Sequence, residues 1–297
     1  MLMGERRYYS ARTGCNPDVL KLDLDTLKQV FLAIYSWFKE ERYFQEVLGY
    51  KWDDGNYFES GTAGRDINAF FVRKLRKQNL WPIEEKVSNY LEDDLFDVIE
   101  LLHDVVSKPV ESQSNAYFPS LVCAFDTDAG RLEFRAEINR ILRDYCEGYQ
   151  LSEDGEVLLI GDTGLESLLE AEVPEFDPDN IDERLKQAVL KYRRYKSSDG
   201  EKREAVRALA DILEYLKKKY ETFLVKADES DLFQIANRFG IRHHEPSQNT
   251  DYDAAIWLPW MFYVYLASIH LSIRLIQRAN SEADEDKTHS TSSIPRT

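Results

Sequence analysis

One short segment of the chain combines side chains that bind phosphate with side chains that transfer protons. The segment reads RFGIRHH and contains Arg238, Arg242, His243 and His244. Arginine is a fixed cation that can bind a phosphate through two hydrogen bonds. Histidine can give or take a proton near neutral pH. Together these residues could hold an RNA phosphate and activate the adjacent 2′-hydroxyl without a metal ion.

Two other interpretations of this segment remain open. It spans a predicted helix end at Gly240 and precedes the last predicted helix, so its side chains could instead cap these helices and pair with nearby carboxylates. Together with the residues that follow it, the segment also offers five potential metal ligands, His243, His244, Glu245, Asp251 and Asp253. Adjacent histidines lack the His-x₃-His spacing that presents two imidazoles to one ion from a helix. We therefore predict no metal and no cofactor.

The basic segment 184–220 supplies the second group of candidate residues. It contains 12 Lys and Arg against 5 Asp and Glu, a net +7, whereas the whole chain carries −16 and the remainder therefore −23. Such a run is usually a solvated helix face, but it is also the footprint of a surface that meets a phosphate backbone. Tyr192 and Tyr195 interleave with the charges, at a spacing that fits packing as well as base stacking. The residues predicted to contact RNA are Arg193, Arg194, Lys196, Lys202 and Arg203.

The other residue types that often carry chemistry give weaker signals. His103 falls on a predicted helix, where a surface or hydrogen-bonded histidine is expected, and His270 is expected to be a satisfied core residue. The three cysteines are widely spaced without a CxxC motif, which disfavours both zinc binding and a secreted disulfide framework. The sequence contains no Gly-rich phosphate loop and no GxSxG motif.

Composition and periodicity predict a mainly α protein. The 297 residues are 43% hydrophobic, which is ample for a core, while 13 Gly and 9 Pro are few for a protein with many β-turns. Residues 1–172 are predicted to be a helical N-terminal region, with helices near 25–38, 65–77, 83–91, 95–106 and 134–145. Residues 110–130 are predicted to be irregular. Apolar runs on both sides of Asp154-Gly155 predict a β-hairpin near 149–160. This hairpin is the one β element that the sequence predicts.

The second half of the chain is predicted to be a helical bundle. The stretch VPEFDPDN, residues 173–180, is acidic and proline-rich and is predicted to be a linker. Residues 181–279 show four helical segments joined by short connections, which favours an antiparallel four-helix bundle. Residues 280–297 are predicted to be a disordered tail.

The last of these helices contains an apolar run that could either cross a membrane or lie in the core of the bundle. Residues 254–273 contain no Asp, Glu, Lys or Arg, and their length is close to the ~20 residues that span a bilayer. The alternative is a central helix buried on all sides within the bundle. Pro259, Ser268, His270 and Ser272 lower its mean hydropathy, and the chain has no second such segment. We predict a buried helix, no membrane partner and a cytoplasmic protein.

The segment 179–278 resembles the HEPN superfamily, as found in bacterial abortive-infection and toxin-like proteins. The resemblance rests on EKREAVRALADILEYLK, DLFQIANRFGIRHH and TDYDAAIWLPWMFYVYLASIHLSIRL, and it covers roughly the last third of the chain. EDDLFDVIELLHDVVSKP is similar to the N-terminal modules of abortive-infection proteins. The resemblance implies a four-helix bundle that dimerises and a metal-independent endoribonuclease with an R-x₄₋₆-H motif at the dimer cleft. Arg238 with His243 or His244 has that spacing.

The leading hypothesis is therefore a HEPN-like ribonuclease or toxin module in a phage-defence protein. Arg242, supported by Arg238, would hold the scissile phosphate, and His243 or His244 would act as general base or acid. The expected partners are RNA, a second copy in a homodimer, and a regulatory protein. The rival hypothesis is a non-catalytic module that binds RNA or protein through the same segment.

Overall fold

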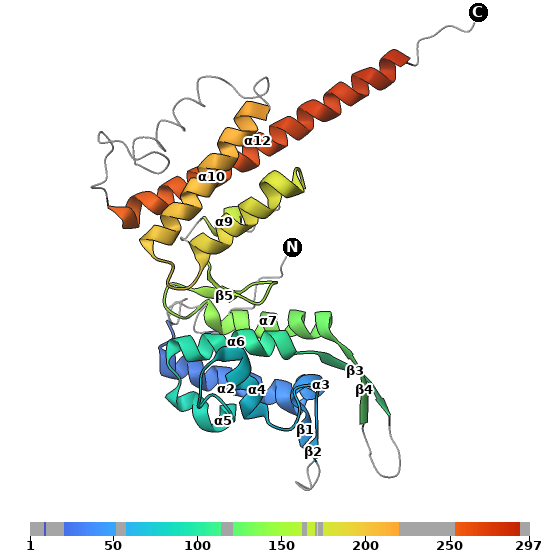
Figure 1. Ribbon diagram of the computed structural model, residues 1–297, viewed down its shortest axis with the longest axis vertical. Helices are drawn as coiled ribbons and strands as arrows, with labels where there is room; N and C mark the ends of the chain where they lie inside the picture. The colour runs from blue at the N-terminus through green and yellow to red at the C-terminus, as the bar shows by residue number, and fades with distance from the viewer. Residues whose placement is uncertain are drawn as a thin grey trace, which may run out of the picture. The chain divides into compact units, whose positions relative to one another are not determined.

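The computed structural model describes residues 9, 21–51, 58–113, 121–161, 165–169, 171, 175–219 and 253–291. This part of the chain is mainly helical with small antiparallel sheets (Figure 1), so the predicted mainly α class is confirmed. The chain divides into two compact units, residues 1–160 and 161–297. The sequence placed the boundary somewhat later, at 173–180.

The sequence of helix α2 (Leu24–Glu40) specifies which of its residues enter the core of unit 1. The helix begins at Asp23, whose carboxylate accepts a hydrogen bond from Thr26 N at 2.8 Å. Such a cap satisfies a backbone N–H that the first turn leaves without a partner. Apolar residues then recur every three or four positions and face inward, as the periodicity predicts. The fully buried ones are Leu27, Phe31, Tyr35 and Phe38.

In the described residues of unit 1, four further helical elements follow α2 and precede residue 127. They are α3 (Gln45–Leu48), α4 (Ile67–Leu75), α5 (Ile83–Lys86) continued by the 3₁₀ turn η1 (Val87–Asn89), and α6 (Glu92–Val105). Helix α7 (Thr127–Leu142) packs against α2. Phe134 of α7 meets Phe38 edge to face at a ring distance of 5.2 Å and Phe44 at 6.1 Å. These aromatic contacts hold together two helices that are about a hundred residues apart in the sequence.

The described residues of unit 1 also form three antiparallel strand pairs. They are β1 (Tyr50–Lys51) with β2 (Phe58–Glu59), β3 (Lys108–Gln113) with β4 (Leu121–Asp126), and β5 (Tyr149–Leu151) with β6 (Val157–Leu159). The last pair is the predicted hairpin. The prediction that residues 110–130 are irregular is wrong, because β3, β4 and the start of α7 lie there. An isolated parallel bridge also joins Leu22, just before α2, to Tyr145, just after α7.

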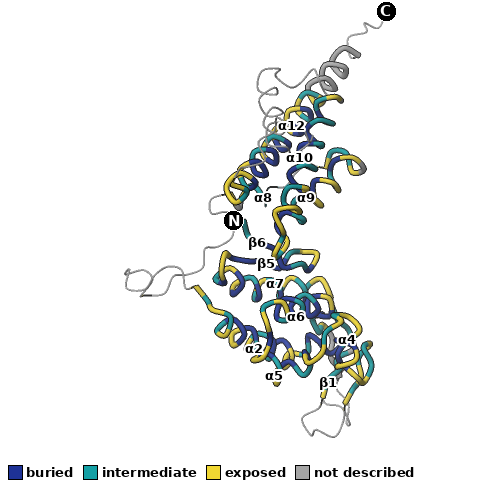
Figure 2. The backbone as a smooth tube through the Cα atoms, turned by 60° about the vertical axis from the view of Figure 1, so that its left-hand side comes forward, coloured by how far each residue is buried: buried dark blue, intermediate teal, exposed yellow. Residues whose placement is uncertain are grey.

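Unit 2 contains α8 (Glu166–Leu169), the π-helical turn η2 (Pro178–Asp182), α9 (Glu183–Arg193), α10 (Asp199–Lys219) and α12 (Ala254–Thr291). Their inward faces form one apolar cluster, and Figure 2 shows the buried residues in dark blue. The apolar faces predicted for α9 and α10 are confirmed, since Leu185, Val206 and Leu209 are buried. The bundle helix predicted near 232–236 lies outside the described residues. Helix α12 continues past Asn280, into the stretch predicted to be a tail.

Helix α12 is the one helix in the described residues that is long and apolar enough to cross a membrane, over Ala254–Ser281. Of its most apolar stretch, 56% is buried inside unit 2. Leu258 and Phe262 face the core, whereas Ile256, Trp260 and Leu271 are exposed. Helix α12 is therefore a core helix along one face only. The prediction that it is buried on all sides is wrong for the opposite face, which shows apolar side chains to the surface.

Candidate nucleic-acid interface

The candidate residues fall into two groups, and the structure describes one of them. The predicted catalytic residues Arg238, Arg242, His243 and His244 lie outside the described residues. The predicted RNA contacts Arg193, Arg194, Lys196, Lys202 and Arg203 lie at the turn between α9 and α10. The candidate interface is therefore built from this turn.

Backbone and hydroxyl hydrogen bonds close the turn after α9. Arg194 N donates to Leu190 O at 3.0 Å and ends the helix. Ser197 then donates twice, from its backbone N to Arg194 O at 3.0 Å and from its hydroxyl to Lys191 O at 2.9 Å. Lys196, which lies between Arg194 and Ser197, adopts a left-handed conformation with φ of +54°. The chain thus reverses within a few residues.

A capping box begins α10 on the other side of the turn. Ser198 N donates to the Glu201 carboxylate at 2.8 Å, and Glu201 N donates back to the Ser198 hydroxyl at 3.3 Å. This reciprocal pair satisfies two backbone N–H groups at the start of the helix. The hydrogen bonds from Ser198, with Lys191 and Arg194 nearby, hold the pKa of the Glu201 carboxyl below its usual value. Glu201 therefore stays ionised and fixes the backbone that carries the basic residues.

Four of the five predicted RNA contacts are displayed at this turn. Arg194 and Lys196 are exposed, and Lys202 and Arg203 are half-buried in the first turn of α10. Arg193 is buried, with 7% exposed, so it does not share this surface. Residues 191–204 carry 6 Lys and Arg against 3 Asp and Glu, a net +3. We call the four displayed residues the basic turn.

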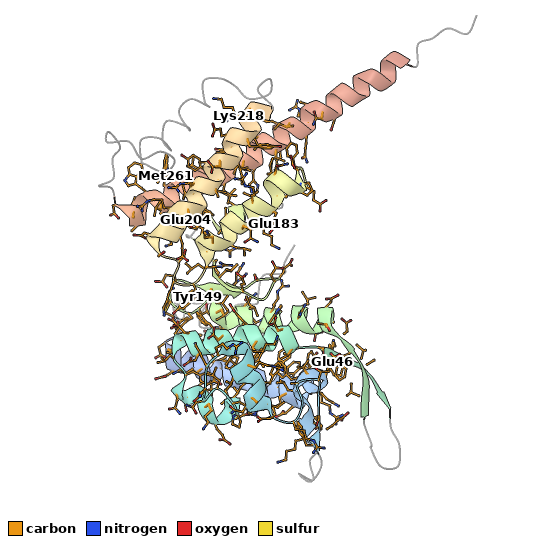
Figure 3. All side chains as sticks on the ribbon, in the orientation of Figure 1. Glu46, Tyr149, Glu183, Glu204, Lys218 and Met261 are labelled. Carbon is orange, nitrogen blue, oxygen red and sulfur yellow. The ribbon has the colours of Figure 1, made fainter. Side chains whose placement is uncertain are left out.

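An ion pair and two tyrosine rings lie beside the basic turn. Lys191 pairs with Glu204, which lies near the start of α10 (Figure 3), at 3.0 Å. The Lys202 ammonium lies 5.8 Å from the ring centre of Tyr192 and that of Lys196 lies 4.8 Å from Tyr195. These contacts bring positive charge close to aromatic faces and restrict both long side chains.

Tyr192 belongs to the core and not to the basic surface. Its ring stacks on Phe262 of α12 at a centroid distance of 3.8 Å and an angle of 10°. Only 7% of Tyr192 is exposed. The spacing of Tyr192 in the sequence was compatible with core packing and with base stacking. The structure shows core packing, so Tyr192 offers no open face for a nucleic-acid base. Tyr195 is half-buried.

His103 of α6 and His270 of α12 are both buried. His270 of α12 is 8% exposed, and burial, followed by the nearby Arg274, lowers its pKa, which keeps the ring neutral. It lines a cavity of about 280 Å³ together with Leu266 and Asp182. His103 of α6 is 1% exposed, and neither ring nitrogen has a hydrogen-bond partner. The prediction that His103 is a surface or hydrogen-bonded histidine is wrong.

Two further candidate sites were not predicted from the sequence. One is the Asp182 carboxylate, whose Oδ1 is buried without a partner while Oδ2 accepts a hydrogen bond from Phe176 N at 3.0 Å. The other is an apolar groove between α2 and α7 in unit 1. Within the described residues no group of three or more His, Cys, Asp or Glu side chains could hold a metal ion.

Comparison with known proteins assigns neither a family nor a function to the chain. No family model, no curated protein and no solved structure matches the chain.

Proposed function

We propose that unit 2 binds RNA through the basic turn and cleaves it with the segment 238–244, as a HEPN-like toxin module of a bacterial defence protein. The observation that carries the proposal is the display of Arg194, Lys196, Lys202 and Arg203 on one braced turn of an otherwise acidic chain. Unit 1 is then the sensor or restraint, and the expected assembly is a cytoplasmic homodimer.

The basic turn suits a phosphate backbone for physical reasons. Binding Lys and Arg to phosphates releases condensed counterions, which supplies sequence-independent affinity. Arg194 and Arg203 can each bind a phosphate through two hydrogen bonds, whereas Lys196 and Lys202 act as point charges. Because the rest of the chain carries excess negative charge, RNA is repelled elsewhere and concentrated at this surface.

The expected chemistry is an internal transfer of the phosphoryl group. One histidine of the pair His243–His244 removes the proton of the 2′-hydroxyl, and the 2′-oxygen attacks the adjacent phosphorus. The other histidine protonates the departing 5′-oxygen. The products are a 2′,3′-cyclic phosphate and a 5′-hydroxyl, so that all atoms and protons are accounted for. Arg242 and Arg238 neutralise the charge that develops on the phosphate oxygens.

The second candidate function is a non-catalytic interaction module, and the exposed face of α12 favours it. Ile256 and Leu271 on that face are 64% and 60% exposed, and Trp260 is 43% exposed. Large apolar side chains gathered on one surface often mark a protein contact. In this case unit 2 would hold RNA or a protein without turning it over.

An RNA assay in EDTA separates these functions. The native protein should bind RNA with a strong salt dependence and cleave it. Arg194→Ala/Lys196→Ala should reduce the slope of log K against log salt by about 0.7 for each phosphate of a single strand that the variant no longer neutralises. Lys218→Ala is the matched control, because Lys218 is an exposed cation of α10 paired with Glu214. His243→Ala/His244→Ala should bind RNA but cleave it about 10²-fold or more slowly.

The outcomes are distinct. Equal RNA affinity of the native protein and the Arg194→Ala/Lys196→Ala variant would remove the basic turn from the interface. Cleavage at the native rate by a folded histidine double variant would show that the proposed catalytic segment is wrong. Binding without any cleavage by the native protein would favour the interaction module.

A further inference from the structure

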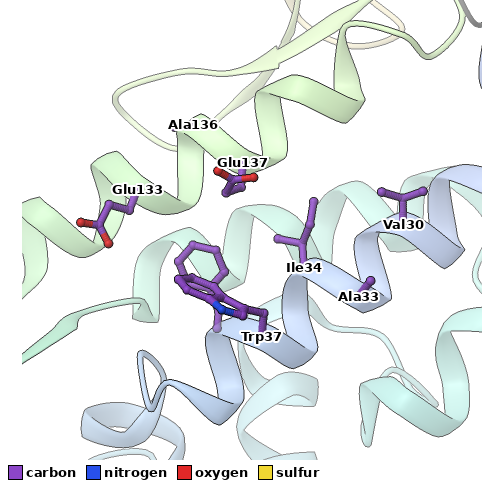
Figure 4. A pocket seen from close by; sticks show the side chains of 8 residues that line it. Val30, Ala33, Ile34, Trp37, Glu133, Ala136 and Glu137 are labelled. Carbon is purple, nitrogen blue, oxygen red and sulfur yellow. The ribbon is translucent and has the colours of Figure 1, made fainter. Parts of the chain in front are cut away.

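A groove runs between the outer faces of α2 and α7 in unit 1. It has a volume of about 580 Å³, within the range of pockets that hold ligands or partner side chains. Figure 4 shows Ile34 and Trp37 of α2 projecting toward α7, with Glu137 opposite them. The lining residues are Val30, Ala33, Ile34, Trp37, Phe38, Glu133, Ala136 and Glu137.

The floor of the groove is apolar and open to solvent. Trp37 is 49% exposed and Val30 is 37% exposed, although the opposite face of α2 is buried in the core. Small side chains at Ala33 and Ala136 stand where larger ones would close the seam between the helices, and both are exposed. An aromatic and two aliphatic side chains therefore line a channel deep enough to receive further apolar groups.

One wall of the groove carries two carboxylates a helical turn apart. Glu133 accepts hydrogen bonds from Lys108 at 2.6 Å and from the Tyr43 hydroxyl, and these donors lower the pKa of its carboxyl. Glu137 accepts from Arg140 at 2.7 Å, in an exposed pair between residues three apart. Exposed pairs of this kind contribute only about 0–1 kcal/mol, so a partner's cation can share or replace them.

The net charge of unit 1 also favours a cationic partner. Residues 1–160 carry 19 Lys and Arg against 29 Asp and Glu, a net −10. A negative surface accelerates the approach of a cationic partner and disfavours an anionic one. The exposed ring of Trp37 adds a face on which a guanidinium or ammonium group can rest.

We propose that the α2–α7 groove binds an amphipathic helix of a partner protein that has Lys or Arg along the flank facing α7. The floor from Val30 to Trp37 spans two helical turns, about 10 Å, which fits apolar anchors at positions i, i+4 and i+7 of a docked helix. Basic residues four apart on that helix match Glu133 and Glu137 on α7. The proposal does not depend on the RNA-binding function of unit 2.

The probe is a fluorescent helical peptide of about 14 residues, with leucines on one face and arginines on one flank. Its control has glutamates in place of the arginines. Anisotropy titrations with the full-length protein should show binding of the arginine peptide at least tenfold tighter than that of the glutamate peptide. Ala136→Trp, which fills the groove from an exposed position, should weaken the arginine peptide at least tenfold. Glu137→Lys should weaken the arginine peptide and improve the glutamate peptide.

Leu132→Ala is the matched control, since Leu132 is 63% exposed on α7 and does not line the groove. It should bind the arginine peptide as the native protein does. Equal affinity for the two peptides, or unchanged binding by a folded Ala136→Trp variant, would overturn the proposal. A native dimer that Ala136→Trp converts to monomer in light scattering would assign the groove to a second copy of this chain, and would also overturn it.

Discussion

Replacing His103 by leucine should reduce the loss of stability of unit 1 between pH 7 and pH 4. His103 lies on α6 with its ring buried under the β5–β6 hairpin. A Cβ at Gly155 of that hairpin would lie 2.5 Å from His103 Nδ1, which shows how closely the hairpin covers the ring. Burial, followed by the positive charges of Arg131 and Arg135, lowers the pKa of His103 from 6.5 to about 4.

The sign and size of the effect follow from this pKa. In the unfolded chain the imidazole binds a proton near pH 6.5, whereas in the folded state it does so near pH 4. The stability associated with the neutral ring is therefore present above pH 6.5 and is lost as the pH falls toward 4. Each pKa unit corresponds to about 1.4 kcal/mol, so the upper bound is about 3 kcal/mol. Leucine does not titrate and leaves no buried nitrogen without a partner, so the variant should also gain about 1 kcal/mol at pH 7.

Urea unfolding at several pH values between 7 and 4 measures this difference. In a Trp257→Phe/Trp260→Phe background, the remaining tryptophans lie in residues 1–160, so fluorescence reports on unit 1. The native sequence should lose a few kcal/mol across this range beyond what His103→Leu loses. Parallel curves for the two proteins would refute the reasoning.

Four further substitutions test unit 2. Ser198→Ala removes the capping box of α10 and should cost about 1 kcal/mol in urea unfolding. Phe262→Ala removes the ring that stacks on Tyr192 and should cost about 3–5 kcal/mol, whereas Tyr192→Phe should cost far less because the stacked rings remain. Trp260→Ser on the exposed face of α12 should change the unfolding free energy by less than about 1 kcal/mol, and the protein should be recovered in the soluble fraction after cell lysis.

The helices and their inner faces could be predicted because each is encoded locally. Leu27, Phe31 and Phe38 recur at helical spacing, and that spacing alone specifies which side of α2 is buried. The β5–β6 hairpin is equally local, since Asp154-Gly155 supplies the turn between two apolar runs. The basic turn was found for the same reason, as its residues are close in sequence.

The failures depend on contacts between segments that are distant in sequence. Nothing beside His103 indicates that a hairpin some fifty residues later will cover it. The β3–β4 pair was missed because Pro109 and the polar residues of β3 are typical of a loop. Proline is tolerated there because each strand of a two-stranded sheet is an edge. The α2–α7 groove arises from packing two helices whose outer faces carry small residues, which no single segment reveals.

The bridge between Leu22 and Tyr145 has a consequence for how unit 1 folds. Each strand pair that the structure describes in unit 1 joins neighbouring segments, and such local contacts form quickly because little chain entropy is lost on closing them. The bridge, in which Leu22 N donates to Asp144 O at 2.7 Å, instead closes a loop of more than a hundred residues. We expect the docking of α2 on α7 beside it to be the slow step of folding. On a ribosome that step has to wait until residue 145 has left the exit tunnel, so α2 is synthesised long before its partner.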